Sequence, residues 1–256
     1  MKIRQIGSAV GNGDGHQNLT TFLINETVAI DAGCLGYISP VEVQRAVKQV
    51  FLSHSHIDHV GSLPSFLSNV YEPRGDGPTI HAGGFVLDSL RRDLFNDRIW
   101  PDLERLSAGV VSFYRTDELV SERPVVVEGL TITPIEVNHV VPTHGFLVQD
   151  ATGTAVLFVS DSGPTERIWE IANATPGLKM VFMECSFPNA LGELAMKTKH
   201  LTPALFEREL AKLKIPAQIV AVHLKTGFHQ TVVEELNALK IRNLEIGGGD
   251  RVWEVS

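Results

Sequence analysis

Strand-like runs and helical patterns of apolar residues alternate along most of the chain. The stretches 1–6, 50–52, 130–137, 154–159 and 218–222 each have the composition of a β-strand. Between them lie segments in which apolar residues recur at helical spacing. Strands that alternate with helices are typical of an α/β or mixed α+β fold, in which helices cover the faces of a sheet.

Capping residues predict where three of the helices begin. Ser39-Pro40-Val41-Glu42 has the form of a capping box with proline at the first helical position, and this helix should end near Gln49. Thr202-Pro203 should open a second helix with one apolar face. Thr231-Val232-Val233-Glu234 is another capping box, which should open a helix that runs toward Lys240.

Several of the predicted strands end at residue types that bind metals. The run 50–52 leads to His54, and the later runs lead to His139, Asp161 and His223. In open α/β sheets, ligands bind beyond the carboxyl ends of the strands. We therefore expect these side chains to converge on one edge of the fold.

The chemically densest stretch has the sequence His-Ser-His-Ile-Asp-His, from His54 to His59. Imidazole and carboxylate groups are ligands that zinc and similar metals accept. Residues two apart on an extended segment point the same way, so His54 and His56 can share one metal, while Asp58 and His59 lie where the chain must turn. The spacing therefore suits two adjacent metal sites better than one. The alternative is a solvated turn that happens to be rich in histidine.

Composition narrows the classes of partner. The 256 residues, 43% hydrophobic and 20% charged, suffice for a real core, and no apolar run approaches the ~18 residues of a membrane span. The N-terminal segment lacks the apolar core of a signal peptide. Only two cysteines are present, Cys34 and Cys185, so we expect a reduced, cytoplasmic setting. The net charge of -8 argues against DNA or RNA and suits a small anionic substrate.

The segment 85–122 differs from the rest of the chain. It holds Arg91-Arg92-Asp93, Phe95-Asn96 and Trp100-Pro101, followed by a stretch rich in leucine, glutamate and arginine. It interrupts the strand rhythm, and we interpret it as a helical insertion that serves as a lid or dimerisation element. The alternative is that its aromatic residues only pack the segment onto the body of the fold. The glycine-rich stretch 11–16, which includes His16, could approach a ligand closely, and the alternative, which we favour for its glycines, is a plain turn.

The HxHxDH motif, followed by His, Asp and His, resembles the signature of the metallo-β-lactamase superfamily. The resemblance implies an αββα four-layer sandwich, with two β-sheets face to face and helices outside, as a single domain over residues 1–256. It also implies the roles of the ligands. The first metal site would comprise His54, His56 and His139, the second Asp58, His59 and His223, with Asp161 as the bridging carboxylate. Asp31 matches an outer aspartate, which orients ligating histidines by accepting their free N–H.

A narrower resemblance, to class II 3',5'-cyclic-nucleotide phosphodiesterases, covers most of the chain. It rests on the motif and its continuation Val60-Gly61-Ser62-Leu63-Pro64, and on the segments 160–164, 184–189 and 223–225. Ser160-Asp161-Ser162 stands where that family has Gly-Asp-Thr. The second half also resembles tRNase Z, in which a glutamate and a histidine occupy the positions of Glu184 and His200. The long basic arm with which that nuclease grips RNA is not found in this sequence.

These resemblances imply hydrolysis of 3',5'-cyclic nucleotides (cAMP or cGMP) to 5'-monophosphates. Two cations about 3.5–4 Å apart can hold a bridging hydroxide, which Asp58 can orient. The basic leaving group should need a general acid, worth roughly 10²–10⁴-fold in rate, and His200 held by Glu184 is the candidate. Lys225 or His144 should stabilise phosphoryl charge, and Trp100 or Phe95 should stack on the base. The alternative is another hydrolase on the same two-metal site, such as a tRNase Z-like nuclease, a lactonase or a thioesterase.

We expect two divalent metal ions per chain, zinc first, although manganese and iron accept the same ligands. The expected partners are a small phosphodiester substrate and a second copy of the chain in a homodimer, with no membrane. A sensor without enzymatic activity is a further possibility, which the complete set of ligands argues against.

Overall fold

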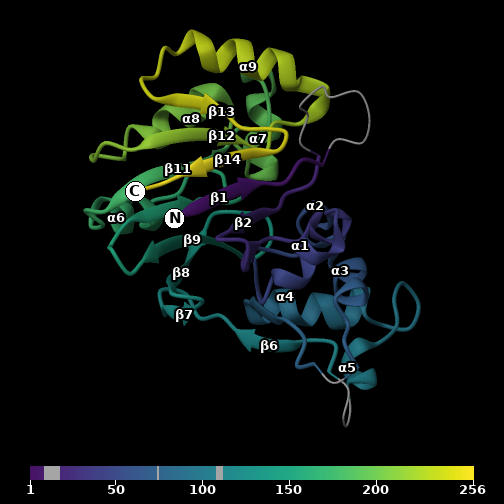
Figure 1. Ribbon diagram of the computed structural model, residues 1–256. Helices are drawn as coiled ribbons and strands as arrows, with labels where there is room; N and C mark the ends of the chain where they lie inside the picture. The colour runs from purple at the N-terminus through teal and green to yellow at the C-terminus, as the bar shows by residue number, and fades with distance from the viewer. Residues whose placement is uncertain (9–17, 74, 108–111) are drawn as a thin grey trace. The chain divides into compact units, whose positions relative to one another are not determined.

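The computed structural model describes residues 1–8, 18–73, 75–107 and 112–256, which fall into two compact units (Figure 1). The N-terminal unit comprises Lys2–Ile6 and Leu19–Val120. The C-terminal unit comprises Met1, the described part of Gly7–Asn18, and Ser121–Ser256. The turn predicted at 11–16 lies outside the described residues. No helix within the described ranges is long and apolar enough to cross a membrane.

A mixed sheet runs through the N-terminal unit, with neighbouring strands in the order β1-β2-β3-β4-β5-β6. Pairing is antiparallel from β1 to β3 and parallel from β3 to β6. The strands are β1 (Lys2–Gln5), β2 (Phe22–Ile24), β3 (Val28–Ile30), β4 (Gln49–Leu52), β5 (Thr79–Ala82) and β6 (Arg115–Glu118). The helices are η1 (Leu35–Tyr37), α1 (Val41–Ala46), α2 (Ile57–Val60), α3 (Leu63–Asn69), α4 (Gly84–Ser89), the π-helical η2 (Leu90–Leu94) and α5 (Leu103–Leu106).

The C-terminal unit contains a seven-stranded sheet in the order β13-β12-β11-β10-β9-β8-β7. Pairing is antiparallel from β7 to β10 and parallel from β10 to β13. Its strands are β7 (Val125–Val127), β8 (Leu130–Val137), β9 (Thr143–Asp150), β10 (Ala155–Phe158), β11 (Leu178–Glu184), β12 (Gln218–Val222) and β13 (Leu244–Ile246), and β14 (Arg251–Glu254) follows. The helices are α6 (Arg167–Asn173), η3 (Asn189–Leu191), α7 (Gly192–Thr198), α8 (Pro203–Leu210), η4 (Thr226–Phe228) and α9 (His229–Ala238).

Each sheet buries both faces of its central strands. In the N-terminal unit, Val50 and Leu52 of β4 belong to one core with residues of α3 and α4, whereas Phe51 between them stacks on His81. In the C-terminal unit, Val181 of β11 packs into a core with α6, α8 and α9, whereas Phe182 stacks on Phe158. This alternation is expected because successive strand side chains point to opposite faces. The two mixed sheets with their helices confirm the predicted α/β class.

Most of the strand predictions are confirmed. β8 and β12 have the predicted bounds, and β10 lies within the predicted run 154–159. The helix predicted after Thr202 is also confirmed, because α8 begins at Pro203 and the Thr202 hydroxyl accepts the Leu205 N–H at 3.4 Å.

The two predicted capping boxes are wrong. Pro40 has extended backbone angles (φ -74°, ψ 164°), so α1 begins one residue later than predicted, without a side-chain cap. This helix ends at Ala46 because Val47 is also extended and leads into β4. In α9 the first residue is His229, since the turn η4 runs straight into the helix and places Thr231 inside its first turn.

The described part of 85–122 is not wholly helical. It holds most of α4, then η2 and α5, and it ends with β6, which pairs in parallel with β5. Phe95 is buried, and Trp100 packs partly buried against the core of the N-terminal unit. These aromatic residues therefore fix the segment to its own unit, and its role as a lid or dimerisation element stays a prediction.

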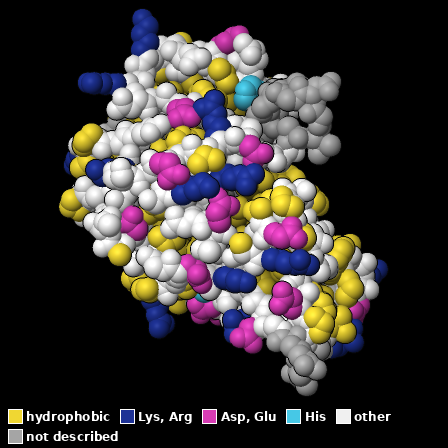
Figure 2. Space-filling view, in the orientation of Figure 1, with side chains coloured by type: hydrophobic (Ala, Val, Ile, Leu, Met, Phe, Trp, Pro, Cys, Tyr) yellow, Lys and Arg dark blue, Asp and Glu magenta, His cyan; other side chains and the backbone are white. Residues whose placement is uncertain are grey.

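Charged side chains of both signs are interspersed over the described surface that Figure 2 shows. Ion pairs also form within each unit, such as Arg167 with Glu122 at 2.8 Å and Arg91 with Glu104 at 2.9 Å. These arginines are thus partly neutralised by neighbouring acids.

Candidate metal and catalytic site

The candidate residues follow the carboxyl ends of strands, as the sequence predicted. In the N-terminal unit Asp31 follows β3 and His54 follows β4. In the C-terminal unit the corresponding residues are His139 after β8, Asp161 after β10, Glu184 at the end of β11 and His223 after β12. Asp31, Ser160 and His223 adopt positive φ angles of 60°, 63° and 58°. Non-glycine residues are uncommon there, and such strained positions cluster at functional sites.

In the N-terminal unit, one buried carboxylate reaches two histidines. Asp31 Oδ2 lies 2.7 Å from His59 Nδ1 and accepts the Ser53 hydroxyl proton at 2.9 Å. The Ser53 oxygen in turn lies 2.9 Å from His54 Nδ1, and the Ser53 N–H donates to Asp31 Oδ1 at 2.8 Å. All four side chains are buried. We call Asp31, Ser53, His54 and His59 the N-terminal set.

In the C-terminal unit, Glu184 makes the same connections. Its Oε1 lies 2.6 Å from His200 Nδ1, and its Oε2 accepts the Ser186 hydroxyl proton at 2.9 Å. The Ser186 oxygen lies 3.0 Å from His223 Nδ1. The backbone N–H groups of Ser162 and Leu201 also donate to the carboxylate, at 3.1 and 3.2 Å. We call Glu184, Ser186, His200 and His223 the C-terminal set.

These hydrogen bonds determine which ring nitrogen carries the proton. The Ser53 hydroxyl donates to Asp31, and the Ser186 hydroxyl has the Glu184 carboxylate and the His223 carbonyl as acceptors. Each serine oxygen is then left to accept from the Nδ1–H of His54 or His223. His139 follows the same rule, since its Nδ1 lies 3.1 Å from the Lys199 carbonyl oxygen, which can only accept. A neutral imidazole with its proton on Nδ1 keeps a lone pair on Nε2. Ligating histidines in metal sites are held in this way.

Donors of the right kind also gather within each unit. His54 Nε2 lies 3.0 Å from His56 Nδ1, so these two ring nitrogens are close enough to bind the same cation. In the C-terminal unit, ligand atoms of Asp161, His200 and His223 lie within 4.8 Å of one another. Buried imidazole nitrogens and a carboxylate at such distances fit a divalent first-row cation.

His200 and His144 have opposite electrostatic environments. Burial lowers the pKa of His200, but the charge and hydrogen bond of Glu184, aided by Asp161, outweigh burial and the opposing charge of Lys225, so the pKa is raised. The pKa of His144 is lowered, because burial outweighs the charge of Glu136, its partner across β8 and β9. His200 is therefore suited to hold a proton near neutral pH, whereas His144 is suited to be a neutral hydrogen-bonding group.

The loop after β3 holds the turn of the motif. The Ala32 N–H donates to the His59 carbonyl at 2.7 Å, and the Thr20 N–H donates to the Asp58 carbonyl at 2.8 Å. A Cβ on Gly33 would lie 2.0 Å from that Asp58 oxygen, far inside contact distance. Only glycine fits there, and its close approach holds the backbone of Asp58, which is half-buried in α2, against the loop after β3.

The predicted substrate contacts are distributed unevenly. Lys225 follows β12, is half-buried, and its charge acts on His200. Trp100 lies in the N-terminal unit with part of its ring against the core. Phe95 is 2% exposed, so it has no ring face left for a base.

Sequence reasoning missed the two serines and Phe85. Ser53 directly precedes His54, and Ser186 stands two residues after Glu184, but adjacency alone does not show that a hydroxyl faces Nδ1. Phe85 is 45% exposed and lines a cavity with Ser55 and Ile57 of the motif. The only feature of the sequence that could have indicated Phe85 was its position at the start of the segment 85–122.

Solved structures show what the fold is. The chain resembles unliganded yeast PDE1 with a TM-score of 0.77 at 18% identity, over 96% of each chain. It resembles the metallo-β-lactamase fold protein YhfI from Bacillus subtilis with a TM-score of 0.71 at 16% identity, over 98% of each chain. It also resembles the short form of human tRNase Z, with a TM-score of 0.71 at 15% identity over 100% of each chain. The fold is the metallo-β-lactamase fold, as predicted.

Sequence comparison gives the family. A probable 3',5'-cyclic-nucleotide phosphodiesterase of Yersinia pestis is 25% identical over 233 residues, which cover 81% of this chain and 64% of that protein. The chain thus spans a little under two thirds of that relative's length. The model of the class-II cAMP phosphodiesterases matches residues 38–238, most of the sequence. The chain belongs to the class-II cAMP phosphodiesterase family.

Proposed function

We propose that the protein is a dinuclear, metal-dependent phosphodiesterase that hydrolyses 3',5'-cyclic nucleotides to 5'-monophosphates. The observation that carries this proposal is the C-terminal set, in which a buried glutamate holds a histidine of raised pKa beside Asp161 and His223. Family membership supports the same reaction. A ribose alkoxide is a basic leaving group, so a protonated histidine close to ligand-type residues suits its release.

The proposed ligands come from both units. Three histidines would hold the first cation (His54, His56, His139). The second would be held by Asp58, His59 and His223, with Asp161 between the two cations. Support for this assignment comes from the Nδ1 protons of His54, His59, His139 and His223, which are already engaged and leave Nε2 as the donor atom. Asp31 would orient His59 directly and His54 through Ser53.

The chain's own groups would act as follows. When bound, the cations supply Lewis acidity at phosphoryl oxygens and lower the pKa of water toward ~7. Asp58 would accept a hydrogen bond from the attacking water and aim it at phosphorus, and the proton that this water loses would be released to solvent. As the new P–O bond forms and the P–O3' bond breaks, His200 would pass its proton to O3'. Glu184 would stabilise the imidazolium before that transfer.

Other side chains would bind the substrate. The cation of Lys225, whose charge is felt at His200, would stabilise the phosphoryl group. His144 would contribute only as a neutral hydrogen-bonding group, because its pKa is lowered. Trp100 would contact the substrate through the part of its ring that the core leaves uncovered.

Metal identity, assembly and location complete the proposal. Zinc is the first candidate, because imidazole donors predominate, with manganese or iron as substitutes. We also propose that the two units form a single domain, that the protein is a cytoplasmic homodimer, and that 85–122 acts as a lid or at the dimer contact. Cys34 and Cys185 are both buried and are not joined in a disulfide, which is consistent with a reducing compartment.

A substrate panel on metal-analysed protein tests the proposal. We expect turnover of cAMP or cGMP, with the 5'-monophosphate as the only nucleotide product. The panel should include bis(p-nitrophenyl) phosphate, a precursor tRNA with a 3' trailer, a lactone and a glutathione thioester. Cleavage of the precursor tRNA or the thioester, with no turnover of cyclic nucleotides, would contradict the proposal and identify the competing hydrolase.

A further inference from the structure

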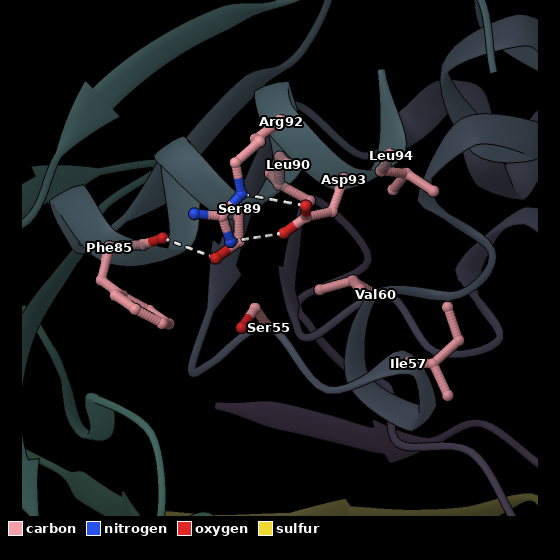
Figure 3. A pocket seen from close by; sticks show the side chains of 9 residues that line it. All are labelled: Ser55, Ile57, Val60, Phe85, Ser89, Leu90, Arg92, Asp93 and Leu94. Carbon is pink, nitrogen blue, oxygen red and sulfur yellow. Dashed lines mark hydrogen bonds and ion pairs between the residues drawn. The ribbon is translucent and has the colours of Figure 1, made fainter. Parts of the chain in front are cut away.

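A cavity of about 250 Å³ opens in the N-terminal unit beside the metal motif (Figure 3). It lies between α2 on one side and α4 with η2 on the other, and its lining includes Ser55, Ile57, Phe85, Leu90 and Leu94. Ser55 and Ile57 alternate in sequence with His54, His56 and Asp58. The cavity is therefore lined by the same stretch of backbone that carries the proposed metal ligands.

The walls of this cavity are apolar and unusually exposed. Ile57 is 68% exposed and Phe85 is 45% exposed, and Figure 3 shows them on opposite sides of Ser55. Leu90 is buried, and Leu94 is half-buried. Large apolar side chains that remain exposed around a cavity are more often part of a binding site than of surface that binds nothing.

The polar groups of the cavity favour a neutral ligand. Arg92 and Asp93 pair with each other at its rim through two hydrogen bonds of 3.0 and 2.8 Å, so their charges largely cancel. Ser89 donates to the Phe85 carbonyl within α4 at 2.9 Å. Among the described residues, the Ser55 hydroxyl has no hydrogen-bond partner, which makes it available to a ligand.

We propose that this cavity binds the nucleobase of the substrate, with Phe85 stacked on the base, Ile57 against its edge and Ser55 hydrogen-bonded to a polar ring atom. The proposal rests on the proposed function, because it takes the phosphate to lie at the motif. A flat, uncharged heteroaromatic ring needs an apolar wall with an aromatic face, and base–aromatic stacking tolerates any base. The ribose would bridge from the cavity to the phosphate.

The test compares ligands that differ only in the base. In wild-type protein, 5'-AMP should inhibit more strongly than ribose 5-phosphate, which lacks the base. Phe85→Ala should raise the KM for cAMP and the inhibition constant of 5'-AMP by about five- to a hundredfold. The inhibition constant of ribose 5-phosphate should change far less, and Phe85→Trp should restore the affinity for 5'-AMP. Ser55→Ala should give a smaller loss, different for AMP and GMP.

Leu106→Ala is the matched control, since Leu106 lies in the same unit at the same 45% exposure but outside the cavity. It should leave both inhibition constants unchanged. An equal loss for 5'-AMP and ribose 5-phosphate in Phe85→Ala would overturn the proposal, because the effect would then be structural. An unchanged constant for 5'-AMP would overturn it too. Failure of the proposed function is distinguishable: wild-type protein would then turn over no cyclic nucleotide, while calorimetric binding of 5'-AMP still tests the cavity.

Discussion

The N-terminal and C-terminal sets contain the same hydrogen-bonded unit built from different parts of the sequence. In each, a carboxylate bonds one Nδ1 directly, at 2.7 Å for Asp31 and 2.6 Å for Glu184. Each carboxylate accepts a serine hydroxyl at 2.9 Å, and each serine meets a second Nδ1 at 2.9 or 3.0 Å. One buried carboxylate thereby orients two imidazoles.

The sets differ in what the directly bonded histidine is suited to do. In the N-terminal set that histidine is His59, a proposed metal ligand whose Nδ1 must keep its proton. In the C-terminal set it is His200, whose raised pKa suits it to hold and transfer a proton. One arrangement of carboxylate, serine and imidazole can therefore serve two purposes. In the N-terminal set it orients a proposed metal ligand, and in the C-terminal set it raises the pKa of a proposed proton donor.

Removing either carboxylate should have the largest effect. Asp31→Ala and Glu184→Ala each leave a buried serine and imidazole N–H groups unpaired, so the free energy of unfolding should fall by roughly 3–5 kcal/mol. Denaturant unfolding of the metal-free variants measures this. The milder variants should separate the roles: Asp31→Asn should lose metal affinity 10–100-fold, whereas Glu184→Gln should lose most rate on substrates with poor leaving groups. Identical losses in both variants would remove the distinction between the sets.

Gly33→Ala should disturb only the N-terminal set. Its Cβ would meet the Asp58 carbonyl at 2.0 Å, so the loop after β3 must shift, and we expect a cost of about 1–3 kcal/mol, with lower metal content. Gly192→Ala is the control, because a Cβ there meets nothing within 4 Å and alanine is the better helix former in α7. Thermal unfolding of the two variants should move in opposite directions. A Gly33→Ala variant with wild-type stability would show that the loop is not fixed as described.

Strand ends could be predicted from the sequence, whereas the start of α1 and the roles of the two serines could not. The lengths of the apolar runs predicted where the strands end. They thereby predicted that His139, Asp161 and His223 follow strand ends. The start of α1 could not be predicted, since the extended backbone of Pro40 overrides its good fit to the first helical position. Ser53 and Ser186 were missed because their roles depend on χ angles and on partners more than 10 residues away, such as Asp31 and His223.

Replacing the bridging serines should have a smaller effect that is the same in both sets. Ser53→Ala and Ser186→Ala each remove one link, which should lower the free energy of unfolding by about 1–2 kcal/mol. Metal affinity should fall roughly tenfold because His54 or His223 loses its orientation. Competition with a chelator of known affinity measures the second effect. Thr175→Val, which removes a buried hydroxyl that donates to the Ile171 carbonyl of α6, should leave metal affinity unchanged.

The smallest predicted effect is a change in pH dependence that arises from the C-terminal set. Since the folded-state pKa of His200 is raised above 6.5, its pairing with Glu184 stabilises the metal-free protein fully below that pH. This contribution is lost as pH rises through the raised value. In Glu184→Gln, burial and the charge of Lys225 both lower the pKa of His200, and only the charge of Asp161 opposes them. The stability of this variant should therefore fall as pH decreases. Thermal unfolding between pH 6 and 8 distinguishes the two slopes, and parallel slopes would contradict the assignment.

The central claim is that the two sets together support a two-cation phosphodiesterase, and metal titration of the stripped protein tests it most directly. Zinc or manganese would be added to metal-free protein while the release of 5'-AMP from cAMP is measured. The account predicts that activity rises with added metal and saturates at two equivalents per chain. Full activity at one equivalent, or activity that does not depend on metal, would contradict it.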